Sequence, residues 1–372
     1  MKKLKVMTVV GTRPEIIRLS EVIKAIDRAS NVFEQTLVHT GQNYDYELNE
    51  IFFEDLGLRK PNVFLAAAGE TALSTIGNIL IKIEKVLDEV KPDIFLVLGD
   101  TNSALCAIAA KRKKVPVFHM EAGNRSFDER VPEELNRKIV DHIADINLPY
   151  STISRQYLLH EGLPADRIIK TGSPMKEVID NNLKKINASV ILKELNIQKN
   201  AYFVVSAHRE ENINDEAHFA NLIATLNMLA KDYQLPIIVS THPRTKKMID
   251  AKAVKVDPLV RLLKPLKFSD YVHLQMNAKI VLSDSGTINE ETSILGLKAL
   301  NIRDAHERPE AMEEASTPMV GLNPMKVKQG IELIESTLNQ TILPVQDYSV
   351  INVSNKVIRI LLSYFNYQIP KK

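Results

Sequence analysis

The sequence contains little of what several functional classes require. One cysteine, Cys106, in 372 residues excludes a disulfide framework and a zinc site built from several cysteines. There is no tryptophan, and aromatic residues make up only 6%, which argues against a groove that stacks single-stranded bases. A net charge of +2 gives no electrostatic basis for binding nucleic acid or a membrane surface.

Long apolar runs and nucleotide loops are also missing. No stretch approaches the roughly 20 apolar residues that a helix needs to cross a bilayer. The apolar run near the N-terminus is too short for a secretory signal and is broken by residues 11–14, Gly-Thr-Arg-Pro. The sequence has neither Gly-x-Gly-x-x-Gly nor a Walker loop, so neither bound NAD nor ATP is supported. We expect a reduced, cytoplasmic globular protein without a cofactor.

Short β-branched runs alternate with longer helical patterns, which is typical of an α/β fold with parallel sheets. The run 94–98 is continuously apolar, which indicates a sheet covered on both faces. Helices are predicted over 16–29, 75–90 and 288–295. The predicted strands are 4–10, 35–39, 94–98, 115–119 and 146–148 in the first half, and 202–206, 237–240, 260–263, 279–283 and 299–302 in the second.

The length favours two domains of roughly 150–190 residues each. Segment 175–200 is charged and shows no strand pattern, so we place the junction just before it. The predicted domains are 1–173 and 174–352, followed by an apolar-periodic helix over 353–366. Two doubly wound domains that face each other would leave a cleft between them, where ligands prefer to bind.

Polar residues follow the predicted strands in both halves, where parallel sheets open onto a ligand crevice. Asp100 and Glu121 each follow an apolar strand, and desolvation there raises a carboxyl pKa towards the range of acid–base catalysis. The alternative is an ion pair with a nearby arginine, namely Arg125, Arg130 or Arg137.

Glu133 and Glu134 fit exposed acids at a helix start, and His208 suits proton handling near neutrality.

Two turns are candidate anion sites. Residues 11–14 open the first helix, and Arg13 and Arg18 lie close enough to reach a diphosphate. Residues 285–287, Ser-Gly-Thr, open the helix at 288, where a glycine lets a phosphate approach. The alternative there is an ordinary helix cap with Glu290 as capping-box partner. His119 and Glu121 could share a strand face as metal ligands, but no third ligand follows at diagnostic spacing, so a metal site is disfavoured.

The order and spacing of seven motifs resemble the non-hydrolysing UDP-N-acetylglucosamine 2-epimerases over nearly the whole chain. The motifs are GTRPE (11–15), LGDT (98–101), HMEAG (119–123), PEE-x-NR (132–137), AHRE-x-N (207–212), DSGTINEE (284–291) and RDAHERPE (303–310). The resemblance implies two Rossmann-like domains of the GT-B type, with the C-terminal helix packed back on the first domain. It also implies a homodimer that needs no metal.

The resemblance assigns roles to individual residues. The implied catalytic group consists of Asp100, Glu121 and Glu133, with His208 assisting near the phosphates. The implied substrate-binding residues are Arg13 and Arg18 from the first domain, Ser285, Gly286 and Thr287 at the diphosphate, Glu291 at the ribose, Tyr271 against the uracil, and Arg308 at the nucleotide or sugar.

The sequence departs from the usual pattern of that family at four positions. Arg18 stands for a lysine, and Thr287 stands for a second glycine. Glu210 stands for an arginine, and Asn43 stands for a histidine. Some members bind a second UDP-sugar as activator through these last two stretches, and we do not extend that activation to this chain.

Four stretches resemble more closely a branch that acts on UDP-2-acetamido-2,6-dideoxy-L-hexoses, namely 41–50, 123–134, 206–212 and 304–315. We therefore expect a C2 epimerase that converts UDP-2-acetamido-2,6-dideoxy-L-talose to UDP-N-acetyl-L-fucosamine for capsule or O-antigen, with UDP-GlcNAc as the next candidate substrate. The reaction would eliminate UDP to a 2-acetamidoglycal and add it back. The alternatives are a hydrolysing 2-epimerase, a GT-B glycosyltransferase and a UDP-sugar sensor without catalysis.

Overall fold

The computed structural model describes residues 2–42, 46–129, 131–207, 215–241, 246, 248–249, 254–304, 308–337 and 344–365. The chain divides into two compact units. The first consists of Met1–Asn181 together with Gln346–Lys372, and the second of Asn182–Val345. Within the described ranges, no helix combines the length and the apolar character needed to cross a bilayer.

The first unit contains a parallel sheet of six strands in the order β3-β2-β1-β4-β5-β6. The strands are β1 (Leu4–Val10), β2 (Phe33–His39), β3 (Val63–Phe64), β4 (Ile94–Leu98), β5 (Val117–Met120) and β6 (Ile146–Leu148). Every residue of β4 and β5 is buried, as expected for strands that helices cover on both faces. This is the strand order of a Rossmann fold.

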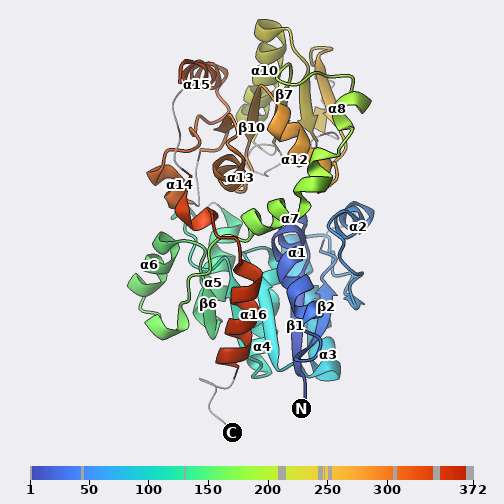
Figure 1. The fold of residues 1–372 in the computed structure, drawn as a ribbon, viewed down its shortest axis with the longest axis vertical. Coiled ribbons are helices and arrows are strands. Elements are labelled where there is room, and N and C mark those ends of the chain that lie inside the picture. Colours follow the sequence, from blue (N-terminus) through green and yellow to red (C-terminus); the bar gives the residue numbers. More distant parts are fainter. Residues whose placement is uncertain are drawn as a thin grey trace. The chain divides into compact units, whose positions relative to one another are not determined.

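The helices of the first unit follow the strands along the chain and pack on the sheet (Figure 1). They are α1 (Arg13–Arg28), α2 (Tyr46–Asp55), α3 (Ala72–Val90), α4 (Cys106–Arg112), α5 (Pro132–Ile143), α6 (Thr152–His160), α7 (Met175–Asn187), which continues into the second unit, and α16 (Val353–Tyr364), with short 3₁₀ turns at Asn102–Leu105, Ala165–Arg167 and Gln346–Tyr348. The core between α3, α4 and the sheet consists of aliphatic side chains such as Ile79, Ile83 and Val97.

The second unit contains a parallel sheet of five strands in the order β11-β10-β7-β8-β9. Its strands are β7 (Phe203–Ser206), β8 (Ile237–Ser240), β9 (Val260–Leu263), β10 (Ile280–Ser283) and β11 (Ala299–Asn301). Its helices include α8 (Ile191–Glu194), α10 (Glu216–Tyr233), α12 (Phe268–Asn277), α13 (Ile288–Leu295), α14 (Pro309–Glu313) and α15 (Pro324–Ser336). In the first sheet β1 lies next to β4, and in the second sheet β7 lies next to β10. The strand order reverses at these points, so each sheet has a topological switch point.

The predicted α/β class with two parallel sheets is confirmed, and so are the ten predicted strands to within two residues at each end. The strand β3 was not predicted, because two residues are too short to show periodicity. The strand β5 begins two residues later than expected. Val115 donates its amide to the Ala110 carbonyl at 3.0 Å and so still belongs to the turn after α4.

The two units meet in sequence at Asn181, eight residues beyond the predicted junction at 173, and residues 346–352 belong to the first unit. Hydrogen bonds explain both differences. Asn181 donates to Glu21 of α1 at 2.7 Å, which ties the first half of α7 to the first unit. Asp347 accepts the amide of Thr152 at 2.9 Å and the ammonium of Lys170 at 2.7 Å, which ties the returning chain to the same unit.

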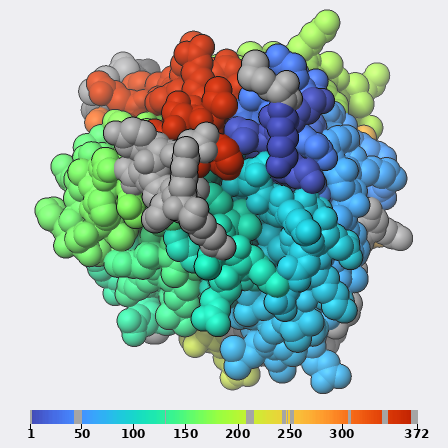
Figure 2. Space-filling model, turned by 90° about the horizontal axis from the view of Figure 1, so that it is seen from below, coloured from blue at the N-terminus to red at the C-terminus, as the bar shows by residue number. Residues whose placement is uncertain are grey.

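The C-terminal helix α16 lies beside α1 in the first unit, as Figure 1 shows. Seen from below, its red surface adjoins the blue surface of the N-terminal segment (Figure 2). Val353, Val357 and Leu361 recur on one face of α16 and are completely buried. Ser354 donates its amide and its hydroxyl to the Glu177 carboxylate on α7, which fixes the start of the helix.

Candidate functional site

The strand order of the first sheet reverses between β1 and β4, so the loops that follow these strands open at the switch point. A buried carboxylate joins them. Glu15, at the start of α1, accepts the amides of Gly11 and Thr12 at 2.6 and 2.7 Å through one oxygen. Its other oxygen accepts the hydroxyl of Thr101, in the loop after β4, at 2.6 Å. Glu15 therefore fixes the two loops against each other.

Glu15 was not predicted to have a role, although it lies in the GTRPE motif. Burial raises the pKa of Glu15 to about 7, and its hydrogen bonds from Thr101, Gly11 and Thr12 oppose that shift. The sequence shows a glutamate three residues after Thr12, which is the capping-box spacing. Its reach to Thr101 depends on the tertiary fold.

Glu121 follows β5 in an unusual backbone conformation. Its φ is +62°, in the left-handed region that a residue with a Cβ seldom adopts. The carboxylate is buried and forms an ion pair with Arg18 of α1, and its second oxygen accepts from the Asn124 amide group at 3.3 Å. A Cβ placed on Gly99 would lie 3.9 Å from the Glu121 carboxylate, so this acid lies next to the loop that carries Asp100.

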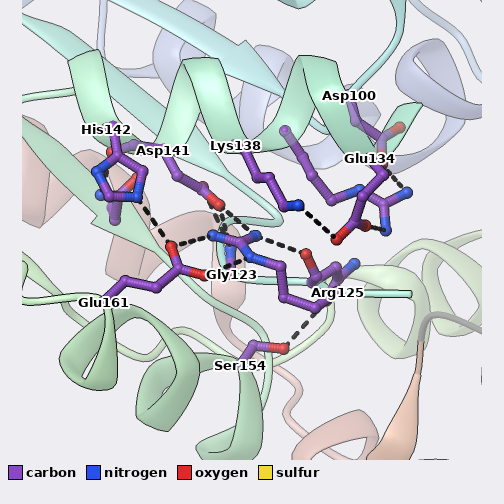
Figure 3. Close-up of polar contacts among 12 residues, drawn as sticks. Asp100, Gly123, Arg125, Glu134, Lys138, Asp141, His142, Ser154 and Glu161 are labelled. Carbon is purple, nitrogen blue, oxygen red and sulfur yellow. Dashed lines mark hydrogen bonds and ion pairs between the residues drawn. The ribbon is translucent and has the colours of Figure 1, made fainter. Parts of the chain in front are cut away.

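Asp100 is paired with a different cation. Its carboxylate lies 2.7 Å from the guanidinium of Arg137 on α5, and Asn136 donates to the Asp100 carbonyl at 2.9 Å. Arg137 also pairs with Glu134 at 3.1 Å. Figure 3 shows Glu134 beside Asp100 at one end of α5. The two predicted acids therefore lie in one region of the first unit, each beside its own arginine.

These contacts show whether Asp100 and Glu121 form ion pairs with the arginines near them in the sequence. The ion-pair alternative is correct for Asp100 with Arg137, and Glu121 pairs instead with Arg18, which was expected to contact substrate. Arg125 contacts neither acid in any ion pair among the described residues and pairs with Asp141 and Glu161. Ion pairing and catalysis are compatible, because a paired carboxylate can still accept a proton when a substrate displaces its partner.

Of the adjacent glutamates on α5, Glu134 is the structural one. It is completely buried and accepts the Ser126 amide at 2.9 Å and the Phe127 amide at 3.3 Å, so it anchors the loop before α5. The interpretation of both residues as exposed acids is therefore wrong for Glu134. Glu133 is partly exposed and has no hydrogen bond or ion pair with the residues that the structure describes, which leaves its carboxylate accessible.

Three further residues singled out in the sequence are Arg13, His208 and His119. Arg13 is the first residue of α1, and its guanidinium lies 5.8 Å from the centre of the Phe52 ring. His208 lies outside the described residues. Both ring nitrogens of His119 are engaged by Asp141 and the Gly99 carbonyl, so His119 has none left for a metal. Over the described ranges, no group of three His, Cys, Asp or Glu residues could hold a metal ion.

In the second unit, the Ser285–Thr287 turn follows β10 at the switch point beside β7. The alternative of an ordinary cap is wrong, because Thr287 has helical angles and its side chain makes no capping hydrogen bond. Its hydroxyl lies 2.9 Å from the Ser285 hydroxyl instead. The turn is partly exposed at the N-terminus of α13, where the helix dipole favours an anion.

Arg308 and Glu291 flank this turn. Arg308 is buried and donates to the Gly286 carbonyl at 3.0 Å, which braces the turn from the segment before α14. Glu291, on the first turn of α13, accepts from Gln275 of α12 at 2.6 Å. Tyr271 lies one helical turn before Gln275 on the same face of α12 and is half-buried. The predicted nucleotide-binding residues of this unit therefore lie on adjoining elements.

Comparison with known proteins shows the family of the chain. A model of the family described as UDP-N-acetylglucosamine 2-epimerase matches residues 24–362. The chain belongs to the UDP-N-acetylglucosamine 2-epimerase family. It is an enzyme of the 2-epimerase type, and the predicted family resemblance is confirmed at this level.

Three relatives define its place in the UDP-N-acetylglucosamine 2-epimerase family. It is 48% identical to the UDP-N-acetylglucosamine 2-epimerase of Rickettsia bellii, with a TM-score of 0.90 over 98% of each chain. It is 33% identical to the Methanocaldococcus jannaschii enzyme solved with UDP-GlcNAc and UDP, with a TM-score of 0.90 over 97% of this chain and 100% of that one. It is 32% identical to the UDP-2,3-diacetamido-2,3-dideoxy-D-glucuronate 2-epimerase of Pseudomonas aeruginosa, over 86% of this chain and 88% of the other.

The buried Glu15 predicts a pH dependence of stability. Because the pKa of Glu15 is raised in the folded state, its contribution is fully present below about pH 4.5 and is lost as the pH rises through about 7. Glu15→Gln keeps the acceptor for Gly11 and Thr12 but does not titrate. Between pH 5 and 8 the free energy of unfolding of the wild type should fall by about 2–3 kcal/mol relative to Glu15→Gln.

Urea denaturation of both proteins at the two pH values checks this prediction. The exposed Glu89→Gln on α3 is the matched control and should follow the wild type at both pH values. A difference between wild type and Glu15→Gln that is the same at pH 5 and pH 8 would contradict the prediction.

Proposed function

We propose that the chain is a non-hydrolysing epimerase that inverts C2 of a UDP-2-acetamido-2-deoxy sugar. The observation that carries this proposal is the pair of carboxylates, Asp100 and Glu121, held beside Gly99 with an arginine on each. Epimerisation needs two proton-handling groups and a cationic binding site for a diphosphate. The first unit contains the acids with Arg13 and Arg18, and the Ser285–Thr287 turn of the second unit is a separate candidate anion site.

The chemistry of the sugar explains why acids and cations are needed together. The C2 proton of a 2-acetamido sugar has no adjacent carbonyl on the ring carbon, so its simple removal would leave an unstabilised carbanion. If the C1–O bond breaks as a carboxylate takes the C2 proton, the electron pair of that bond leaves with UDP and a 2-acetamidoglycal forms. A second acid then protonates C2 from the opposite face, and UDP adds back to C1.

We assign the proton transfers to Asp100, Glu121 and Glu133, with His208 assisting near the phosphates. Arg18 would be shared between Glu121 and the substrate, because it already lies in the site and carries a charge that does not titrate. Its guanidinium could turn towards the departing diphosphate as negative charge develops there. In the second unit Glu291 would bind the ribose, Tyr271 the uracil and Arg308 the nucleotide or sugar.

We favour UDP-2-acetamido-2,6-dideoxy-L-talose over UDP-GlcNAc as the substrate, with UDP-N-acetyl-L-fucosamine as the product for capsule or O-antigen synthesis in the cytoplasm. The support is the local resemblance of four stretches, including 123–134, which carries Glu133. A relative named for a diacetamido-glucuronate sugar supports the view that this family is not confined to UDP-GlcNAc.

We also propose that the enzyme is a homodimer. Leu73 and Ile81 lie two turns apart on α3 and expose 80% and 62% of their surface, an apolar face that a second copy of the chain could cover. Sedimentation velocity should then give the mass of two chains, and a mass of one chain at micromolar concentration would contradict the proposal.

The reaction products distinguish the proposed epimerase from a hydrolysing epimerase, a glycosyltransferase and a sensor without catalysis. The enzyme should be offered UDP-2-acetamido-2,6-dideoxy-L-talose and UDP-GlcNAc in parallel, and the mixtures followed by ¹H and ³¹P NMR. We expect one UDP-sugar to convert to its C2 epimer with the diphosphate intact, and the 6-deoxy sugar to react with the higher kcat/KM. Free sugar with stoichiometric UDP would indicate a hydrolysing epimerase, and no reaction with either sugar would contradict the proposal.

Removal of either acid should slow the reaction in a protein that still folds, although Glu121→Gln also removes a partner of the buried Arg18 and should lower the free energy of unfolding. Asp100→Asn and Glu121→Gln keep the size of the side chains and should each lower kcat by roughly 10²–10⁴-fold, the usual contribution of general acid–base catalysis. The matched control is Glu34→Gln on β2, an exposed acid that should leave kcat unchanged. Circular dichroism checks folding, and full activity in both folded variants would contradict the assignment.

A further inference from the structure

We propose that His119 is a positioning residue of the epimerase. As a doubly protonated imidazolium, His119 donates a hydrogen bond to the Gly99 carbonyl. This bond fixes Asp100 in the orientation that proton transfer needs. The inference rests on the proposed function, in which Asp100 handles a proton. The only role that the sequence suggests for His119 is that of a disfavoured metal ligand, and in the structure other groups engage both ring nitrogens.

The hydrogen bonds of His119 define its protonation state. The ring is completely buried on β5, with Nε2 2.7 Å from the Gly99 carbonyl oxygen and Nδ1 2.9 Å from the Asp141 carboxylate. A carbonyl oxygen can only accept, so Nε2 must carry a hydrogen. Asp141 also accepts from Arg125 at 2.7 Å and from the Gly123 amide at 3.2 Å, so it is an acceptor towards Nδ1 as well.

The charges around the ring support the imidazolium. Burial alone would lower the pKa of His119, but the hydrogen bond and the negative charge of Asp141, with the Gly99 carbonyl, outweigh it and raise the pKa. Arg125 continues the network to Glu161, which lies 2.6 Å from its guanidinium. Figure 3 shows Asp141 and Glu161 converging on Arg125. Cations and anions therefore alternate from the buried His119 to the exposed Glu161, which avoids an uncompensated charge in the core.

The Gly99 peptide is the link between His119 and Asp100. Gly99 has φ +70° at the end of β4, and its carbonyl belongs to the same peptide group as the Asp100 nitrogen. The Gly99 amide is fixed separately by the Met120 carbonyl at 2.9 Å. Asn136 then holds the Asp100 carbonyl at 2.9 Å. Side chains therefore fix the peptide groups on both sides of Asp100, and His119 supplies one of those two contacts.

A neutral histidine could not donate hydrogen bonds to both the Gly99 carbonyl and the Asp141 carboxylate. Either tautomer has one donor, so one ring nitrogen would present a lone pair to the Asp141 carboxylate or to the Gly99 carbonyl. With the hydrogen on Nδ1 the bond to the Gly99 carbonyl is lost, and with the hydrogen on Nε2 the Nδ1 lone pair is repelled by Asp141, which would turn the ring away from Gly99. In either case Asp100 would lose its fixed direction. A displacement of about 1 Å at a reacting group can lower a rate by roughly 10²-fold, so a positioning role should appear in kcat.

A double-mutant cycle of His119 and Asp100 tests whether His119 acts on the reaction through Asp100. His119→Gln retains an N–H donor group but loses the positive charge, and it should lower kcat for the turned-over UDP-sugar by roughly 10–100-fold with KM changed less than threefold. In the Asp100→Asn background the same change should have little further effect, because its target is already lost. His142→Gln is the matched control, since His142 contacts Glu161 at 2.9 Å on the half-exposed side of the network and should leave kcat unchanged.

The outcome of the cycle decides the inference. An unchanged kcat in folded His119→Gln, or an equal fall in both backgrounds, would overturn it. Absence of turnover by the wild type on either sugar would instead contradict the proposed function.

A second measurement does not depend on activity. ¹⁵N NMR of the wild type labelled at histidine, followed as the pH rises, should show one ring that keeps both nitrogens protonated above the ordinary histidine pKa. A folded His119→Gln protein should lack that signal. If every ring of the wild type loses a proton at or below the ordinary histidine pKa, His119 does not hold Gly99 in the way proposed.

Discussion

The buried ion pair between Arg18 and Glu121 is the constraint on which the site depends. Burial of two charges is costly, and removal of one partner of such a pair typically destabilises a protein by about 3–5 kcal/mol. The left-handed backbone of Glu121 adds a strain of about 1–3 kcal/mol, which persists only where the surroundings fix it. Stability alone does not explain a buried ion pair in this position, because well-packed apolar residues in place of both partners would avoid the burial of two charges.

Three further buried acids hold the loops around this pair. Glu15 joins the loops that follow β1 and β4, Glu134 fixes the chain before α5, and Asp141 fixes Gly123 and His119. Each accepts backbone amides or hydroxyls from a loop that carries a candidate functional residue. These three acids fix the loops and so differ from Asp100, Glu121 and Glu133, which we propose to move protons.

The sequence was sufficient for much of this arrangement, since parallel strands bring their carboxyl ends to one edge. The positions of Asp100 and Glu121 after apolar strands predicted that they would be neighbours, and the structure places them beside Gly99. The partners of these acids were not predictable, because Arg18 reaches Glu121 across 103 residues. The roles of Glu15 and Asp141 likewise depend on contacts between distant segments.

Local helix geometry accounts for the remaining differences. Glu133 and Glu134 are adjacent, and only the rotation of α5 decides which of them faces the core. Thr287 has the residue type and the spacing of a cap, yet its backbone is already helical. The junction at Asn181 follows from hydrogen bonds of α7 that no sequence pattern shows.

In the proposed reaction the C2 proton leaves the sugar and a proton from solvent replaces it. The most direct test is epimerisation in D₂O of the UDP-sugar that the enzyme converts, followed by mass spectrometry and ¹H NMR of the product. We predict one deuterium at C2 of each product molecule, with the UDP linkage restored. A product inverted at C2 that retains its original hydrogen would contradict the account.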